Sequence, residues 1–545
     1  MNLPHGSGHV IRSGLAVLAL AIGLTHAILY HPSEPFYNGD EPRHVTTGIF
    51  VRDLIHDTPL RDPVAYAVRY YAQYPALGIP YFPPLFYVLE GAAMSLFGTS
   101  ALVGRALVLI ACFMACAYLF LLVLRSHGPR AALLAGLFLA IAPAPFTLSR
   151  YVMLEMPALA WSMAAIYYYT RYAETEKRGD LIGAALATAA AALTRFTAVF
   201  LIPMIGIHLL LTRRFHLLRR AEVVVAAAGA AALVLPYYIL AACTSGHVHW
   251  PQIAGNAGVA GLGGVLWTYP SAVPGQLGWF LLVAALLGIA AIVAMREYRG
   301  TAPYLAMALA TYLTVAPIGL RDPRFAVSWV PAFAFFAAYA CDWVWNAGGR
   351  VAGILIAAIV LVGTGWLTWE APRPFLVGYE TAARYVLNNT TSPVCLFDGT
   401  LNGNFIYQIR RMDPSRRLWI LRGDRTLYSI TVSPEFGYRE FSSTEADMAT
   451  RLYRYDPELI VVEDPPIYFR TPAGDRLRNL LRDHPRRFHA VAEFPLQTNL
   501  PQVRGAMLRV YRNLVRNPNP DIRIRLEVDL LQRPLETDLP KRSSH

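Results

Sequence analysis

The chain has 545 residues, of which 55% are hydrophobic and 15% are charged, and its formal net charge at pH 7 is +12. This composition excludes an ordinary soluble protein, in which about a quarter of the residues are charged. The basic excess does not indicate a nucleic-acid partner, because much of it lies in short connections between apolar segments, as in membrane proteins. The 5 cysteines show no Cys-x-x-Cys or zinc-type spacing, so no disulfide framework or thiolate metal site is predicted.

Apolar segments with charged ends predict a multi-pass α-helical membrane protein with about eleven spans. We interpret the first segment as a retained span, because it has no convincing small-residue cleavage site for a signal peptidase. A further apolar segment, residues 83–98, is short and contains Glu90. The spans are expected at residues 10–30, 101–124, 131–148, 157–172, 181–195, 197–212, 221–243, 277–295, 302–319, 325–344 and 350–369.

The basic connections decide how residues 83–98 are placed. Membrane proteins keep arginine and lysine on the cytoplasmic side. All the basic connections face that side only if residues 83–98 do not cross the membrane, so we expect a juxtamembrane or re-entrant helix there. Two interpretations of Glu90 then remain open: it belongs to the site, or it faces water. The basic connections are residues 125–130, 177–178, 212–220, 296–299 and the one that ends at Arg350.

This topology places several charged residues together on the outer face. Charges beside an apolar bundle are costly to desolvate, so we expect them to line a site or to pair with one another. Two simpler interpretations remain, since Asp40 suits the N-cap of a helix and single arginines often extend to the membrane surface. The outer charged residues are Asp40, Glu41, Arg43, His44, Arg150, Glu155, Arg195, Arg321 and Arg324.

Residues 372–545 follow the membrane region, residues 1–371, and have the pattern of an extracytoplasmic α/β domain. Strands alternate with helices, which predicts a small layered sheet. Residues 513–545 are polar and are expected to pack loosely as a tail. Strands are expected at 394–397, 418–421, 459–462, 490–494 and 507–511, and helices at 378–388, 402–411, 444–455 and 473–483.

An outer-face pocket with carboxylates and arginines suits a reaction on a phosphate-bearing amphiphile. A guanidinium group binds phosphate oxygens in a planar fork, and an apolar groove suits a lipid tail. A carboxylate removes a proton from an acceptor hydroxyl or amine. Phosphate leaves as an anion, so one base and several cations suffice to transfer a group from a lipid phosphate. If that group is a sugar, a single displacement inverts its anomeric centre.

The order of these motifs resembles glycosyltransferase family 39 and its bacterial relatives in the GT-C superfamily. These include the protein O-mannosyltransferases and the lipid A aminoarabinose transferases. The resemblance covers roughly residues 10–345 and is specific in order rather than in any single motif. It rests on Asp40-Glu41-Pro42-Arg43, on Phe82-Pro83-Pro84-Leu85-Phe86-Tyr87, on Phe97-Gly98 followed by Arg105, on Arg150 with Glu155, and on residues 321–325.

The resemblance implies an integral membrane enzyme that takes a sugar from a polyprenyl-phosphate donor. It implies that Asp40, with Glu41 beside it, and Glu155 are the catalytic acids, and Asp40 is our predicted base. Relatives of the aminoarabinose type have lysine before the Pro-Pro pair, where this chain has Phe82. The phosphate contact must then pass to Arg195, Arg321 or Arg324, or the donor differs. The expected donor-phosphate ligands are Arg43, Arg150, Arg195, Arg321 and Arg324, and His44, Tyr81, Tyr87 and Tyr151 are expected in the substrate pocket.

The sequence does not identify the transferred sugar or the acceptor, and it does not decide whether a metal ion is bound. A hard divalent cation would take oxygen ligands from Asp40, Glu41 and Glu155. A His247-Val248-His249 zinc site is the weaker interpretation. Trp250, Trp267 and Tyr269 are candidates to stack on a sugar. The expected partners are a polyprenyl-phosphate-linked sugar, a lipid, glycan or protein acceptor, and the bilayer of a bacterial inner membrane.

A transporter or flippase of an anionic lipid-linked amphiphile is the alternative function. Such proteins show internal repeats and charged residues at the middle of the membrane. The chain shows no clear repeat, and its informative charges lie at one face, so the sequence favours the transferase.

Overall fold

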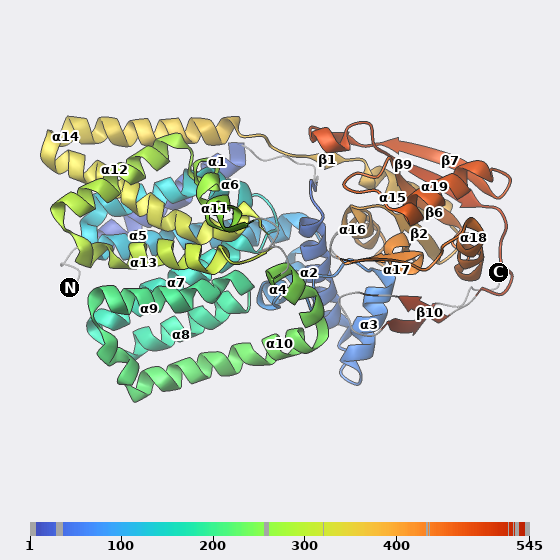
Figure 1. Cartoon of the computed structure of the whole chain (residues 1–545), viewed down its shortest axis with the longest axis horizontal. Coiled ribbons are helices and arrows are strands. Elements are labelled where there is room, and N and C mark those ends of the chain that lie inside the picture. Colours follow the sequence, from blue (N-terminus) through green and yellow to red (C-terminus); the bar gives the residue numbers. More distant parts are fainter. Residues whose placement is uncertain are drawn as a thin grey trace.

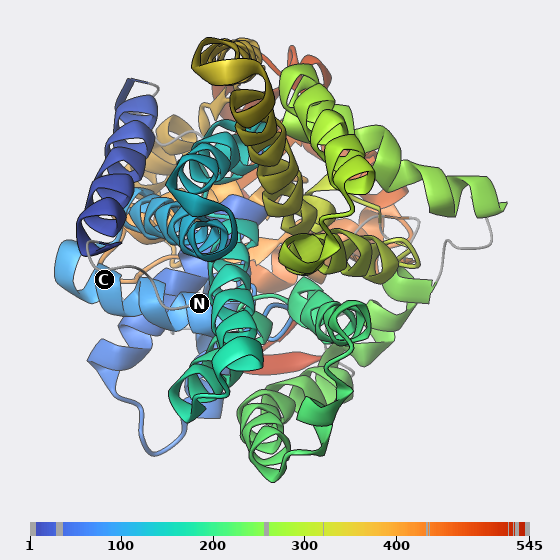
Figure 2. The ribbon, with the colours of Figure 1, turned by 90° about the vertical axis from the view of Figure 1, so that its left-hand side faces the viewer.

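The computed structural model describes residues 7–28, 36–254, 261–319, 321–431, 434, 437–520, 523–526, 528 and 534–539. Helices occupy the chain up to Glu370, and all described strands follow it. Figure 1 shows the helical region on the left and the strand-containing region on the right. Figure 2 looks at the helices from the end near the N-terminus, with the strand-containing region, in orange and red, behind them. The predicted combination of a helical region and a C-terminal α/β region is confirmed.

The helical region begins with a long apolar helix and continues through short helices to a second long set. Its elements are α1 (Ser7–Ile28), α2 (Asp40–Asp57), α3 (Pro63–Gln73), α4 (Leu85–Phe97), α5 (Ala101–Ile141), α6 (Pro143–Leu148), α7 (Glu155–Thr175), α8 (Arg178–Ala192), η1 (Phe196–Phe200), α9 (Leu201–Thr212), η2 (Phe215–Arg219), α10 (Ala221–Ala254), α11 (Gly261–Leu277), α12 (Trp279–Met295), α13 (Tyr298–Val315), η3 (Pro323–Trp329) and α14 (Val330–Glu370).

Among the described residues, 4 helices are long and apolar enough to cross a membrane, or 5 if a bent pair formed by α11 and α12 counts as one span. Two of them are broken by a glycine at positive φ, Gly128 in α5 (φ 83°) and Gly349 in α14 (φ 85°). Only glycine adopts such a conformation without strain. Each break lies between two segments that the sequence predicts as separate spans. The total of eleven spans stays a prediction.

The basic connections of the helical region pair with acidic residues near the ends of neighbouring helices. They lie at the end of the region that is farthest from the strands, where α14 turns back on itself (Figure 1). This shared position agrees with the prediction that they face one side of the membrane. Ion pairs join Arg125 to Glu174, Arg130 to Asp342, and Arg220 to Glu176.

Helix α4 is the short apolar segment that the sequence leaves ambiguous. It packs against α2 and α5, and Glu90 on it has 0% exposure. Glu90 is therefore neither the water-facing residue nor the pocket residue that the sequence allows. Its carboxyl group lies against Gly48 of α2 and Gly104 of α5, where a Cβ atom would clash with it.

The strand-containing region has a sheet of five strands in the order β3-β2-β6-β9-β7. Strands β2, β3 and β6 are parallel, and β9 is antiparallel to both β6 and β7. All five strands and all four helices predicted here are confirmed. Their bounds are β2 (Val394–Asp398), β3 (Trp419–Arg422), β6 (Leu459–Asp464), β7 (Phe488–Pro495), β9 (Met507–Asn513), α15 (Tyr379–Asn389), α16 (Asn402–Met412), α18 (Glu445–Tyr455) and α19 (Pro472–Asp483).

Small pairs of strands complete the region. Strand β1 (Leu376–Val377) pairs with β8 (Gln497–Thr498), and β4 (Tyr428–Ile430) pairs with β5 (Tyr438–Glu440).

The prediction of a loose tail after residue 513 is wrong in part. Strands β10 (Arg523–Leu526) and β11 (Leu535–Asp538) form a hairpin there, which packs on α3 and on α17 (Gly423–Thr426) because its Ile524 and Leu526 are buried.

Buried polar contacts fix the two regions together. Arg410 on α16 donates through Nε to Oδ2 of Asp53 on α2 at 3.2 Å, and the Tyr70 hydroxyl donates to the same oxygen at 2.7 Å. Arg416 pairs with Asp57 nearby, and its Nη2 lies 3.1 Å from Oδ1. The strand-containing region therefore packs directly against α2 and α3, the helices that follow the first span.

Candidate functional site

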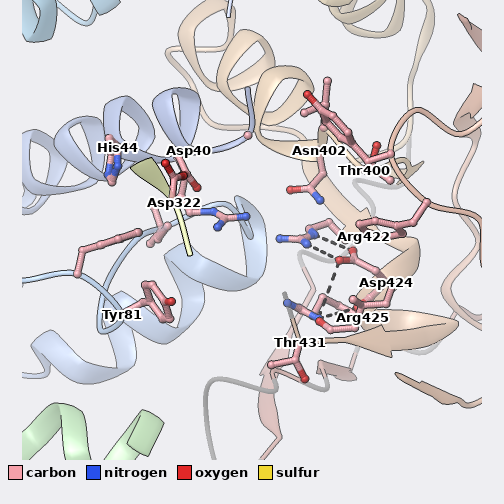
Figure 3. Close-up of a pocket in the computed structure, with 18 of the residues that line it drawn as sticks. Asp40, His44, Tyr81, Asp322, Thr400, Asn402, Arg422, Asp424, Arg425 and Thr431 are labelled. Carbon is pink, nitrogen blue, oxygen red and sulfur yellow. Dashed lines mark hydrogen bonds and ion pairs between the residues drawn. The ribbon is translucent and has the colours of Figure 1, made fainter. Parts of the chain in front are cut away.

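A cavity of about 600 Å³ lies between the two regions. One wall, the membrane wall, comes from α2, α3, residues 77–83 before α4, residues 195–196, residues 237–246 of α10, and residues 318–325. The other, the strand wall, comes from residues 398–402, 422–431 and 466–478. Figure 3 shows the two walls facing each other, with Asp40, His44 and Asp322 on one side and Arg422, Asp424 and Arg425 on the other.

Asp40 is the first residue of α2, but it does not cap the helix. The Oδ1 atom of Asn38 accepts hydrogen bonds from the backbone N–H groups of Asp40 (3.1 Å) and Glu41 (2.9 Å). The Asp40 carboxylate is therefore left to face the cavity, and its side chain is 30% exposed. A negative charge is favourable at this position because of the helix dipole.

Arg324, from η3, joins the acids of two different outer loops. Its Nη2 donates to Oδ2 of Asp40 at 2.9 Å, and its Nε lies 3.4 Å from Oε1 of Glu155. Arg195 approaches the same Glu155 oxygen with Nη2 at 3.0 Å. Asp322 also pairs with Arg324, with 2.7 Å between Oδ2 and Nε. Residues that the sequence assigns to four outer segments thus form one cluster.

The charges of the cluster set the protonation states of its members. Burial raises the pKa of Asp40, but the guanidinium groups of Arg324 and Arg43 outweigh this and lower the pKa to about 2. Burial lowers the pKa of His44 to about 3, and the Nδ1 atom of this ring lies 2.7 Å from the Tyr87 hydroxyl. At neutral pH Asp40 is therefore a carboxylate and His44 is neutral.

Two arginines of the membrane wall are left for a ligand. Arg195 and Arg324 are engaged by carboxylates, whereas Arg43 and Arg321 make no side-chain ion pair or hydrogen bond with the described residues. Phe82 also lines the cavity, and its ring packs at 4.8 Å from that of His44. Arg43 and Arg321 are thus available to an anionic ligand of the cavity.

Glu41, which we expect beside Asp40 in catalysis, points elsewhere. Its side chain has 0% exposure, and its Oε1 accepts hydrogen bonds from Arg105 Nε at 2.9 Å and from the Val152 backbone N–H at 3.0 Å. Adjacent helix residues point in directions about 100° apart, so Asp40 faces the cavity while Glu41 faces α5. The geometry gives Glu41 a structural position.

Four further predicted residues lie outside the cavity lining. Glu155 is directly behind it, 1% exposed and in contact with Arg195 and Arg324. Tyr87 supports His44, and Tyr151 packs its ring on Tyr37 at 4.6 Å. The Arg150 guanidinium lies over the Phe146 ring at 5.9 Å. The predicted residues that do line the cavity are Asp40, Arg43, His44, Tyr81, Arg195, Arg321 and Arg324.

The proposed metal ligands do not form a site. Asp40 and Glu155 share an arginine, and Glu41 faces away from both. Within the described part of the chain, no group of three His, Cys, Asp or Glu side chains is placed to hold a metal ion. The side chains of His247, His249 and Trp250 lie outside the described residues. Trp267 is 72% exposed and Tyr269 is buried, and neither lines the cavity.

The strand wall contains residues that the sequence motifs do not reveal. Asp398 ends β2, Arg422 ends β3, and Pro466 follows the end of β6. Ligands of open α/β sheets bind outside the carboxyl ends of the strands. The signal was therefore present in the predicted strands, since the carboxyl ends of the three parallel strands β2, β3 and β6 each contribute a residue to the cavity.

Comparisons with known proteins agree with this architecture. Residues 82–240 match the family model of the dolichyl-phosphate-mannose-protein mannosyltransferases. ArnT from Cupriavidus metallidurans bound to undecaprenyl phosphate superposes with a TM-score of 0.62 at 16% identity, over 94% of this chain and 100% of that one. No curated protein matches the sequence.

Two other solved structures share the fold. Arabinofuranosyltransferase AftD from Mycobacteria gives a TM-score of 0.55 at 14% identity, over 95% of this chain and 41% of that one. The archaeal oligosaccharyltransferase AglB from Archaeoglobus fulgidus, in complex with an inhibitory peptide and a dolichol-phosphate, gives 0.53 at 13% identity, over 84% and 70%. The resemblance that the motifs indicate is confirmed: the chain shares the fold of ArnT, AftD and AglB, and it matches the mannosyltransferase model over residues 82–240.

Proposed function

We propose that this protein is a membrane glycosyltransferase that moves a sugar from a polyprenyl-phosphate donor to an acceptor at the outer face of the membrane. The observation that carries the proposal is the cluster in which Arg324 joins Asp40 and Glu155, at a cavity lined by two arginines that make no ion pair with the described residues. The fold shared with ArnT, whose solved structure holds undecaprenyl phosphate, supports the lipid-phosphate donor.

In this proposal the donor binds along the membrane wall. Its phosphate would bind Arg43 and Arg321, whose guanidinium groups suit phosphate oxygens. Its lipid chain would leave past an apolar part of the same wall. That part consists of Phe196, Tyr237, Tyr238, Ala241, Ala242 and Ile318.

Asp40 is the base in this proposal, and Glu155 positions the arginines. Asp40 faces the cavity, whereas the Glu155 side chain is 1% exposed and contacts both Arg195 and Arg324. The acceptor oxygen attacks the anomeric carbon, and its proton passes to the Asp40 carboxylate. The bond between the anomeric carbon and the phosphate oxygen breaks, and its electron pair leaves with the phosphate. One displacement inverts the anomeric configuration.

Arg324 links donor binding to the basicity of Asp40. A carboxylate with a pKa of about 2 is a weak base. A donor phosphate that draws Arg324 away from Asp40 would remove the main favourable charge and raise the pKa of Asp40. The base would then gain strength when the donor is in place.

The proposed orientation in the membrane follows from the position of the basic connections. We propose residues 1–371 as a multi-pass domain of a bacterial inner membrane and residues 372–545 as its extracytoplasmic domain. The basic connections at the far end of the helices would face the cytoplasm.

The test is the release of sugar from a panel of radiolabelled polyprenyl-phosphate sugars by the purified full chain, with bacterial membranes as the acceptor source and with and without EDTA. The proposal predicts transfer from one donor with inverted anomeric configuration. Failure of the folded protein to bind or turn over any donor would contradict it, and retention of configuration would contradict the single displacement. Loss of turnover with EDTA would assign a metal.

A further inference from the structure

The strand wall coincides with a topological switch point of the sheet. From β2 the chain passes to β3 on one side, and from β6 it passes through α19 to β7 on the other side. The carboxyl ends of β2 and β6 are neighbours, so the two connections leave a crevice between them. Such crevices are where open α/β sheets bind their ligands. Here the crevice opens into the cavity that Asp40 faces (Figure 3).

The arginines of the crevice are engaged by carboxylates of the same wall. Asp398 accepts a hydrogen bond from the Tyr428 hydroxyl at 2.7 Å and pairs with Arg478 at 3.2 Å. Asp424 accepts from Nε of Arg422 at 2.8 Å, and Nη1 of Arg425 lies 3.9 Å from the same carboxylate. The strand wall therefore offers many hydrogen-bonding groups that are held by ion pairs, whereas Arg43 and Arg321 opposite make no ion pair with the described residues.

Asn402 supplies an unused hydrogen-bond acceptor. It is the first residue of α16 and only 5% exposed, and its Oδ1 has no hydrogen-bond partner in the described structure. Its side chain projects into the space between the two walls (Figure 3). A buried acceptor without a partner is unfavourable, so a ligand with hydroxyl donors would satisfy it.

The loop that carries this group is held rigidly. Glu463 is fully buried, and its carboxylate accepts hydrogen bonds from the backbone N–H groups of Thr400 (2.7 Å) and Leu401 (2.9 Å) and from the Tyr379 hydroxyl (2.7 Å). Across the crevice, Tyr468 and Phe469 add aromatic rings to the lining. Planar polar groups beside aromatic faces suit a pyranose ring, which has both hydroxyl groups and apolar C–H faces.

We infer that this crevice is the acceptor subsite and that the acceptor is a saccharide. The inference rests on the proposed transferase function and names its second substrate. Saccharide hydroxyl groups bind Asn402 and the ion-paired groups of the strand wall, and one further hydroxyl group reaches toward Asp40. The unpartnered acceptor oxygen of Asn402 would repel the oxygens of a phosphate headgroup, and Arg43 and Arg321 of the membrane wall remain for the donor.

The experiment supplies the purified full chain in nanodiscs with a radiolabelled donor and three acceptor probes: a panel of methyl glycosides and short oligosaccharides, a serine- and threonine-containing peptide, and a phosphorylated glycolipid analogue. Label transferred to a saccharide hydroxyl supports the inference. Label found only on the peptide or on the lipid phosphate overturns it. Donor binding is measured separately, so a protein that binds no donor contradicts the proposed function itself.

Variants locate the subsite. Asn402→Ala should raise the KM for the saccharide about ten-fold, as expected for one lost hydrogen bond to a ligand, while donor binding stays unchanged and shows that the protein is folded. Asn402→Asp, which keeps an acceptor oxygen, should recover part of this loss. Asn479→Ala, an exposed change on α19, is the matched control. An unchanged KM in Asn402→Ala would overturn the inference.

Discussion

Arg324 donates to Asp40 at 2.9 Å although 284 positions separate the two residues in the sequence. The same guanidinium group contacts Glu155 and Asp322. One arginine at the end of the membrane region thus controls the charge environment of the proposed base, and its removal should be visible in the pH dependence of catalysis.

Arg324→Gln should move the acidic limb of the pH–rate profile upward. The Arg324 charge is the largest favourable contribution to the low pKa of Asp40, and burial opposes it. Without that charge the pKa rises, so the carboxylate is lost at a higher pH, and activity should begin to fall at a pH at which the wild type still keeps its carboxylate. Profiles of kcat/KM measure this, with Arg324→Lys as the charge-retaining control. Superimposable acidic limbs would count against the linkage.

Arg43→Gln and Arg321→Gln should weaken donor binding. Each removes a guanidinium group that has no ion pair with the described residues and faces the cavity. A lost charge-assisted hydrogen bond corresponds to about a ten-fold or greater rise in the donor Kd. Titration with polyprenyl phosphate measures it, and Arg61→Gln, an exposed arginine between α2 and α3, is the control. Equal affinities in all three variants would exclude both arginines as phosphate ligands.

Glu41→Gln should reduce stability more than catalysis. Its buried carboxylate pairs with Arg105 and accepts from the Val152 N–H. Removing one partner of such a pair typically costs about 3–5 kcal/mol. Thermal unfolding in detergent should show a lower Tm, while the folded fraction retains a kcat within a few-fold of wild type. A large fall in kcat without a change in Tm would instead support the catalytic role that its sequence position suggests.

Arg410→Met should loosen the strand-containing region from the helices. The change removes the buried cation of Asp53, whose side chain is 2% exposed, and leaves this carboxylate paired only with Arg52, which is 32% exposed. We expect a loss of up to about 3 kcal/mol and faster proteolysis near residues 371–376. Arg411→Met, at a side chain that is 30% exposed, should cost less than about 1 kcal/mol. Similar stabilities of the two variants would show that Asp53 is solvated without Arg410.

The sequence predicts the strands and helices of residues 378–511 well, because short apolar runs between turn residues mark buried strands. It does not predict the hairpin at β10 and β11, since those strands are short and polar, and their pairing depends on packing against α3 and α17.

The candidate site, too, is predicted only in part by the sequence. Charge placement brings Asp40, Glu155, Arg195 and Arg324 to one face, and the structure joins them. The sequence does not separate Asp40 from its neighbour Glu41, because only tertiary packing decides which face of α2 meets the cavity. Asn402 carries no motif, and its place emerges only when the sheet topology is known.

The most direct test of the central claim compares Asp40→Asn with Asp62→Asn, an N-cap substitution at α3 that preserves the capping oxygen. Both variants are measured for donor binding and for kcat at saturating donor. The account predicts that Asp40→Asn binds donor but loses at least about 10²-fold in kcat, while Asp62→Asn matches wild type. Turnover by Asp40→Asn at the wild-type rate would contradict the assignment of Asp40 as the base.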